Sequence, residues 1–141
     1  AMHMQGVPQT MQKNPVYSDV LTSIRYFFSE KIAEAHAAGI NDVIIDPGFG
    51  FGKTLEHNFT LLKHLNTIHV EGVPLLVGVS RKSMIYKTLE IDVADALNGT
   101  TALNTVALQQ GAHILRVHDV KEAKEVIRLV DALDAAYPIN P

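Results

Sequence analysis

The sequence contains no cysteine. Disulfide bonds, thiolate metal sites and cysteine nucleophiles are therefore excluded. It also has no stretch approaching the roughly 18 consecutive apolar residues of a membrane span, and its first residues lack the charged and apolar regions of a signal peptide. We therefore expect no membrane partner and a cytoplasmic location.

Basic residues are few: the sequence has 12 Lys and Arg and 15 Asp and Glu, which gives a net charge of -3. This balance argues against a nucleic-acid partner. None of the seven histidines forms H-E-x-x-H or another tight metal pair, so the sequence predicts no metal ligand. The 141 residues, 47% of them hydrophobic, suffice for one globular domain with one core, spanning residues 1–141.

The hydrophobic residues that are present follow alternating helical and strand-like periods. A first predicted helix stops at Gly39 and has the apolar face Val20, Ile24, Phe27, Phe28, Ile32 and Ala35. Further helices are predicted at 55–65, around 94–110, and after a capping-box-like start at Asp119 and Glu122, with the apolar face Val120, Ala123, Ile127, Val130 and Leu133. Buried strands are predicted at 43–45, 74–79 and 113–117. Met2-His3-Met4 reads as the end of an earlier strand, followed by a polar loop to Tyr17.

This alternation predicts a parallel α/β architecture of four strand-loop-helix units, each about 35 residues long. A closed TIM (β/α)₈ barrel needs roughly 250 residues, so the sequence resembles half a barrel. The alternative is a small open doubly wound sheet. Met2-His3-Met4 favours the half barrel, because it reads as a strand that lacks its beginning.

One glycine-rich segment, Asp46-Pro47-Gly48-Phe49-Gly50-Phe51-Gly52-Lys53, directly follows the strand predicted at 43–45. The strand would deliver the Asp46 carboxylate to a pocket, and the glycines would let backbone N–H groups approach a flat or anionic ligand. A solvated turn is the simpler interpretation. Gly52-Lys53-Thr54 ends like a Walker A loop, but Pro47 stands where that motif needs glycine. A P-loop-like nucleotide-binding module is therefore the less favoured alternative.

Charged and polar side chains gather at the carboxyl ends of the predicted strands: Asp46, Ser80, Arg81, Lys82, Arg116, His118 and Asp119. Parallel α/β proteins bind ligands at that edge, and the last two loops of a barrel commonly hold a phosphate. Some of these residues have simpler explanations. Arg81 could be a surface charge, His113 a packed strand residue, and Asp119 a helix cap.

Four motifs together resemble the dihydropteroate synthase family of folate biosynthesis: the opening Met2-His3-Met4-Gln5-Gly6, the glycine-rich segment, Gly78-Val79-Ser80-Arg81-Lys82-Ser83 and Arg116-Val117-His118-Asp119. The resemblance implies the C-terminal half of that family's barrel, from about strand five to helix eight. It also implies a transferase, and a target of sulfonamides, that condenses 6-hydroxymethyl-7,8-dihydropterin diphosphate with 4-aminobenzoate. The products would be 7,8-dihydropteroate and diphosphate.

The resemblance further implies roles for single residues. Asp46 would hold the amino and ring N–H groups of the pterin, Lys82 the pterin oxygen and a ring nitrogen, and Ser80 would lie near the aminobenzoate carboxylate. The implied substrate-binding residues are Met2, Asp46, Gly50, Phe51, Gly78, Ser80, Lys82, Arg116 and His118. Of these, Lys82, Arg116 and His118 would be catalytic, since Arg116 and His118 grip the diphosphate.

Several expectations concern the chain as a unit. In the family, Mg²⁺ assists the leaving group through the diphosphate and the N-terminal half, which this chain lacks. We therefore expect this chain alone to be inactive and to form homo-oligomers. The alternatives are a non-catalytic pterin- or anion-binding fragment and a pterin-binding methyltransferase, although the Ser-Arg-Lys-Ser and Arg-Val-His loops favour the synthase.

Overall fold

The alternating periods of the sequence become helices and short strand segments in the computed structural model, which describes residues 1–6 and 17–136. The elements in chain order are α1 (Val20–Ala37), α2 (Leu55–Lys63), η1 (Leu65–Ile68), β1 (Leu76–Val77), α3 (Ser83–Leu89), η2 (Val93–Asp95), α4 (Leu97–Gln109), β2 (Ile114–Leu115) and α5 (Val120–Asp134). The polar loop predicted up to Tyr17 lies mostly outside the described residues.

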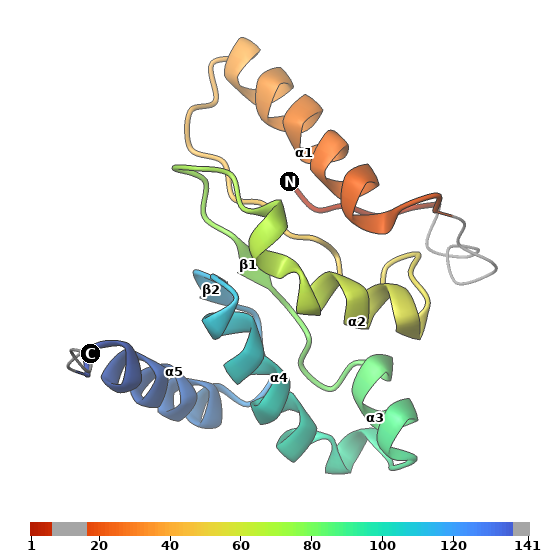
Figure 1. Cartoon of the computed structure of the whole chain (residues 1–141), viewed down its shortest axis with the longest axis vertical. Helices are drawn as coiled ribbons and strands as arrows, with labels where there is room; N and C mark the ends of the chain where they lie inside the picture. The colour runs from red at the N-terminus through yellow and green to blue at the C-terminus, as the bar shows by residue number, and fades with distance from the viewer. Residues whose placement is uncertain (7–16, 137–141) are drawn as a thin grey trace, which may run out of the picture.

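The strand segments pair in chain order and in parallel. Strand β1 pairs with β2, with Leu76 opposite Ile114. Single parallel bridges join Met2 to Asp46 and Ile45 to Leu75. A doubly wound sheet would reverse its strand order at a switch point, whereas a barrel adds each strand beside the previous one. The fold is therefore half of a (β/α)₈ barrel. Helix α1 lies at the top of the view, α2 lies below it, and α3, α4 and α5 lie across the lower part from right to left (Figure 1).

Helix α1 illustrates how the sequence specifies an element. The carboxylate of Asp19 caps its first turn by accepting a hydrogen bond from the backbone N–H of Thr22. Its buried residues, Val20, Ile24 and Phe28, belong to the predicted apolar face. The helix ends before Gly39, which has a φ of +80° and so occupies the left-handed region that terminates helices.

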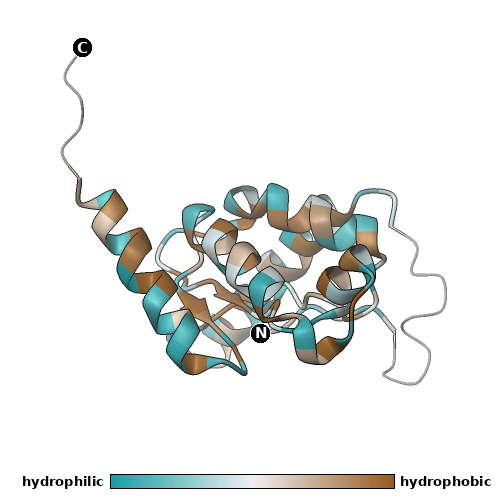
Figure 2. Cartoon of the chain, turned by 90° about the horizontal axis from the view of Figure 1, so that it is seen from below, coloured by the Kyte–Doolittle hydropathy of each residue, from teal (hydrophilic) through white to brown (hydrophobic). Residues whose placement is uncertain are grey.

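The core lies between the helices and the strand segments. Leu75, Val77 and Val79 are fully buried, as is Ile45 on the neighbouring segment. Apolar residues gather on the strand segments beneath the helices (Figure 2). Ile44 was predicted to be part of a buried strand but is 44% exposed, whereas its neighbour Ile45 is buried. Among the described residues, no helix has the length and apolar character needed to cross a membrane.

Three sequence predictions were wrong in detail. The regular strands are shorter than predicted, with two residues each in β1 and β2. Helix α3 was not predicted. The capping box of α5 is absent, since Asp119 makes no side-chain cap bond. Two residues of the predicted α5 face, Val120 and Leu133, are 59% and 60% exposed, whereas Val126 is buried.

Candidate functional site

Four of the seven residues predicted at the carboxyl ends of the strands, Ser80, Lys82, Arg116 and His118, line one small pocket. Its volume is about 120 Å³, and it is lined by Gly78, Ser80, Lys82, Arg116, Val117 and His118. The loop after β1 and the loop after β2 supply all of these residues. Because parallel strands end at a common edge, residues 38 positions apart in sequence become neighbours here. We call this space the anion pocket.

Asp46 lies beside the anion pocket and is only 7% exposed. Its Oδ1 accepts a hydrogen bond from the backbone N–H of Gly48 at 2.8 Å. Its Oδ2 lies 3.5 Å from Nη2 of Arg116. One oxygen is thus held by its own loop, while the other makes only a long ionic contact that a ligand N–H could replace.

The glycine-rich segment packs tightly against the first residues of the chain. Gly48, Gly50 and Gly52 all have positive φ, between 64° and 80°. A Cβ on Gly48 would overlap the carbonyl oxygen of His3, and a Cβ on Gly52 would overlap that of Gln5. At Gly48 and Gly52, glycine is therefore required for two reasons: the positive φ, and the close approach of another backbone segment. The solvated-turn interpretation of this segment is wrong.

Lys53 points into the protein. Its ammonium donates to the carbonyls of Gly48 at 2.9 Å and Phe51 at 3.2 Å, and it lies 3.0 Å from Nδ1 of His3. Burial lowers the pKa of Lys53 to about 8, and burial together with the Lys53 charge lowers the pKa of His3 to about 4. A Walker lysine must reach a phosphate, so the P-loop interpretation of Gly52-Lys53-Thr54 is wrong.

Lys82 crosses from the loop after β1 to the glycine-rich segment. Its ammonium donates to the carbonyl of Phe49 and lies 4.6 Å from the centre of the Phe51 ring. A Cβ on Gly50 would lie 3.5 Å from the Lys82 side chain. Burial, followed by the neighbouring Arg116 charge, lowers the pKa of Lys82 to about 8. Lys82, Phe51 and Gly50, three of the predicted substrate-binding residues, thus lie together.

Arg116 lies across Gly78. A Cβ on Gly78 would come within 3.0 Å of Nε and 3.1 Å of Nη2 of Arg116. The guanidinium side chain is nevertheless 52% exposed, so it remains accessible to a ligand. Met2, another of the predicted substrate-binding residues, pairs with Asp46 in the first strand bridge and is 37% exposed.

Ser80 and His118 are bonded to each other. Ser80 Oγ lies 2.9 Å from Nδ1 of His118 and accepts the His118 backbone N–H at 3.2 Å. If the hydroxyl donates to Nδ1, the ring proton sits on Nε2, where it can serve an anion. Ser80 is only 4% exposed. The prediction that it approaches an aminobenzoate carboxylate stays untested, whereas its contact with His118 is direct.

Sequence reasoning missed the partners of Arg81 and Asp119. Arg81 was considered a surface charge and Asp119 a helix cap, but they form a bidentate ion pair with both N···O distances at 2.9 Å. His113 was expected to be a packed strand residue. It is instead exposed, stacks on His69, and accepts the Leu75 backbone N–H through Nδ1.

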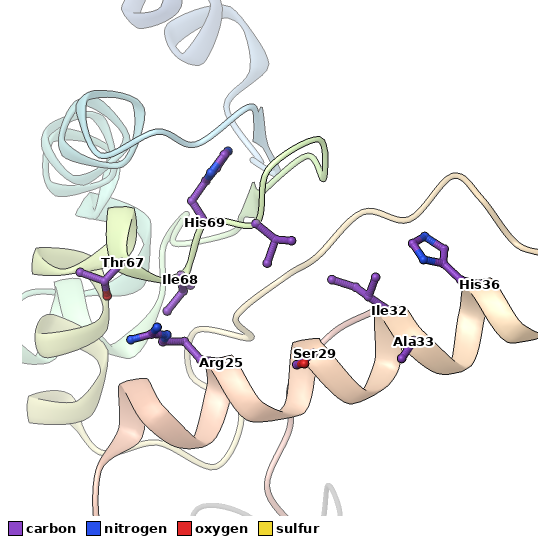
Figure 3. A pocket seen from close by; sticks show the side chains of 9 residues that line it. Arg25, Ser29, Ile32, Ala33, His36, Thr67, Ile68 and His69 are labelled. Carbon is purple, nitrogen blue, oxygen red and sulfur yellow. The ribbon is translucent and has the colours of Figure 1, made fainter.

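A larger cleft lies away from these residues, between α1 and the segment 67–70 (Figure 3). Its volume is about 400 Å³, and its lining comprises Arg25, Ser29, Ile32, Ala33, His36, Thr67, Ile68, His69 and Val70. None of the predicted site residues lines it. Size alone does not identify a site, and the convergent charges favour the anion pocket.

The described residues offer no group of three or more His, Asp or Glu side chains that could hold a metal ion. Asp46, the carboxylate nearest the anion pocket, already contacts Gly48 and Arg116. The residues present therefore do not fit a magnesium site on their own.

Comparison with known proteins agrees with this geometry. Residues 1–118 match the pterin binding enzyme family. The chain is 50% identical over 133 residues to dihydropteroate synthase of Escherichia coli K12, covering 93% of this chain and 47% of that protein. It thus spans about half the length of the curated relatives it matches.

Solved structures give the same result. The Yersinia pestis dihydropteroate synthase in a sulfonamide drug complex superposes with a TM-score of 0.93 at 48% identity, covering 96% of this chain and 50% of that one. The Thermus thermophilus enzyme superposes with a TM-score of 0.90 at 40% identity in its complex with 6HMPPP, covering 95% of this chain and 54% of that one. The same enzyme is also known in complex with 4-aminobenzoate.

Proposed function

The chain belongs to the pterin binding enzyme family, and on that premise we propose that it supplies part of the active site of a dihydropteroate synthase. Residues 1–141 would form a partial domain of that enzyme, from about the fifth strand to the eighth helix. The observation that carries the proposal is the convergence of Lys82, Arg116 and His118 on one pocket beside Asp46. The substrates would be 6-hydroxymethyl-7,8-dihydropterin diphosphate and 4-aminobenzoate.

The pterin would bind between the glycine-rich segment and the loop after β1. The Oδ2 atom of Asp46 would accept its amino and ring N–H groups, replacing the long contact with Arg116. Lys82 would donate to the pterin oxygen and a ring nitrogen. The slot itself would be shaped by Met2, Gly50, Phe51 and Gly78, with the Arg116 guanidinium stacked over the ring.

The diphosphate would bind Arg116 and His118. In the reaction, the amine nitrogen of 4-aminobenzoate attacks the methylene carbon of the pterin. The bond from that carbon to oxygen breaks, its electron pair leaves with the diphosphate, and the amine gives up a proton. Negative charge grows on the leaving oxygen, where the Arg116 and His118 donors already stand, so these groups lower the barrier. Ser80 holds His118 in place for this role.

For the metal and for turnover, we propose less for this chain than the resemblance to the family implies. Mg²⁺ is expected for the family, but the described residues do not fit it, so we assign no metal ligand to this chain and derive no step through a metal. Turnover is proposed for the complete enzyme. For this chain by itself, which spans about half the length of its relatives, we expect pterin or anion binding without turnover.

Calorimetric titration with diphosphate tests the proposal. We expect Arg116→Met to weaken diphosphate binding on the order of tenfold or more, because it removes a charge-assisted contact. Arg25→Met is the matched control, since Arg25 lines the other cleft and should leave the affinity unchanged. Equal losses in both variants, or no binding to the wild type, would refute the assignment of the anion pocket.

A further inference from the structure

Arg81 combines an unfavourable backbone conformation with an unusually complete set of hydrogen bonds. Its φ is +52°, in the left-handed region that residues other than glycine rarely adopt. Nε and Nη2 donate to the two carboxylate oxygens of Asp119, and Nη1 donates to the carbonyls of Val93 at 2.9 Å and Ala94 at 2.6 Å. All three guanidinium nitrogens are therefore engaged.

The backbone of Arg81 is fixed as well. Its N–H donates to Oγ1 of Thr100 at 3.0 Å, and Thr100 is only 2% exposed and bonds back to the Ala96 carbonyl. The strained conformation is thus held from both the backbone and the side chain. Strain that the surroundings hold in this way is common where a loop must present particular side chains.

The left-handed turn decides where the neighbours of Arg81 point. Ser80 and Lys82, the residues on either side, both line the anion pocket, whereas the Arg81 side chain extends to Asp119. Asp119 in turn directly follows His118, which lines the same pocket from the other loop. The ion pair therefore joins two loops at positions adjacent to the Ser80–His118 bond.

We propose that the Arg81–Asp119 pair is a positioning device for the anion pocket: it fixes the loop after β1 against the loop after β2, and thereby sets the Ser80–His118 contact. The proposal rests on the proposed function only for its effect on ligand binding. An ordinary exposed ion pair contributes little, but this one is bidentate, and both partners have side chains that are 21% exposed. Arg81 touches no substrate in this account and acts through Ser80 and His118.

The first test needs no ligand. Ring nitrogen chemical shifts of His118, measured by NMR, report whether Nδ1 is hydrogen-bonded. We expect Arg81→Met and Asp119→Asn each to shift the Nδ1 signal, and the double variant to add little to either. Lys121→Met is the control, because it removes only an exposed contact of 3.9 Å to Glu125. Unchanged Nδ1 signals in both single variants, with dispersed backbone spectra, would overturn the proposal.

Glycine substitutions separate backbone strain from the ion pair. Arg81→Gly keeps the left-handed conformation at no cost but removes the side chain, so we expect it to shift the His118 signal as Arg81→Met does. Glu90→Gly is the matched control, since Glu90 is the other described non-glycine residue with positive φ, at 55°. A wild-type His118 signal in Arg81→Gly would mean that the left-handed turn alone sets the Ser80–His118 contact, and would overturn the role proposed for the ion pair.

The second test measures diphosphate affinity by calorimetry. We expect Arg81→Met and Asp119→Asn each to weaken binding about tenfold, non-additively in the double variant. Arg81→Lys should not restore the affinity, because an ammonium cannot form the bidentate fork. Additive losses would contradict the coupling. If the wild type binds no diphosphate, the proposed function fails, while the NMR test still decides whether the pair positions His118.

Discussion

The ammonium group of Lys82 lies 4.6 Å from the centre of the Phe51 ring, and it also donates to the carbonyl of Phe49. This contact joins the loop after β1 to the glycine-rich segment, two parts of the chain that the proposed pterin would bridge. Lys82 is thereby held in a partly buried position beside Arg116, which explains its lowered pKa of about 8. The charge of the pocket should therefore depend on pH in an accessible range.

We expect the affinity for 6-hydroxymethyl-7,8-dihydropterin diphosphate to fall as the pH rises through about 8. The pKa of Lys82 lies at about 8, below its ordinary value of 10.5, so the folded protein loses this positive charge at a lower pH than an ordinary lysine would. Calorimetry between pH 7 and 9 measures the change. In Lys82→Met the step near pH 8 should be missing, and an unchanged step in that variant would assign it to another group.

Asp46→Asn should weaken pterin binding roughly tenfold to a hundredfold, because a neutral amide replaces the carboxylate acceptor. The amide oxygen can still accept from Gly48, so the loop should keep its shape. Asp131→Asn on the exposed side of α5 is the matched control. Fluorescence titration with a pterin gives both affinities, and equal affinities in wild type and Asp46→Asn would remove Asp46 from the site.

Gly78→Ala should displace the Arg116 side chain and weaken diphosphate binding. The new Cβ would come within 3.0 Å of Arg116 Nε, and the half-exposed guanidinium can move away more easily than the buried backbone. Gly39→Ala is the control. It is strained by a φ of +80° but meets nothing within 4 Å, so it should lower stability without changing diphosphate affinity. Unchanged diphosphate affinity in Gly78→Ala, with a lowered affinity in Gly39→Ala, would contradict the packing described for Gly78.

Lys53→Met should destabilise the fold by roughly 2–4 kcal/mol, because it leaves the carbonyls of Gly48 and Phe51 without their buried donor. Urea unfolding measures the loss. In the wild type, the free energy of unfolding should rise between about pH 8 and 10.5, because unfolded Lys53 keeps its proton longer than folded Lys53 does. Lys53→Met should reduce that rise. A variant with full stability but lost nucleotide binding would revive the P-loop interpretation.

We also expect this chain to self-associate. Large apolar side chains are exposed on the described surface, including Ile44 at 44% and Leu129 at 73%. Unpaired strand edges and open apolar faces favour pairing with another copy. Light scattering over a concentration series should show a mass that rises with concentration. Leu129→Lys together with Ile44→Lys should shift the equilibrium toward the monomer, and a wild type that stays monomeric throughout would contradict this expectation.

Much of the site could be predicted from the sequence because parallel strands end at one edge. Asp46, Lys82, Arg116 and His118 each follow a recognisable apolar run, so their convergence required only the correct fold class. These predictions depended on local periodicity, which the structure retains even though its regular strands are short.

Other features depend on contacts that no local pattern contains. The Arg81–Asp119 pair joins residues 38 positions apart and needs a left-handed φ at an arginine, for which the sequence gives no signal. Asp119 has the spacing to Glu122 that is typical of a helix cap. Its carboxylate instead accepts two hydrogen bonds from the Arg81 guanidinium, which is the stronger interaction. Pro47 already disfavoured a phosphate-binding role for Lys53, but no local pattern indicates that its ammonium donates to the backbone carbonyls of Gly48 and Phe51.

A crystal structure of this chain with 6-hydroxymethyl-7,8-dihydropterin diphosphate would show directly where both parts of the substrate bind. We expect diphosphate density against Arg116 and His118, and pterin density between Asp46 and Lys82. Density in the cleft lined by Arg25 and His69, or phosphates enclosed by the glycine-rich segment, would contradict this expectation.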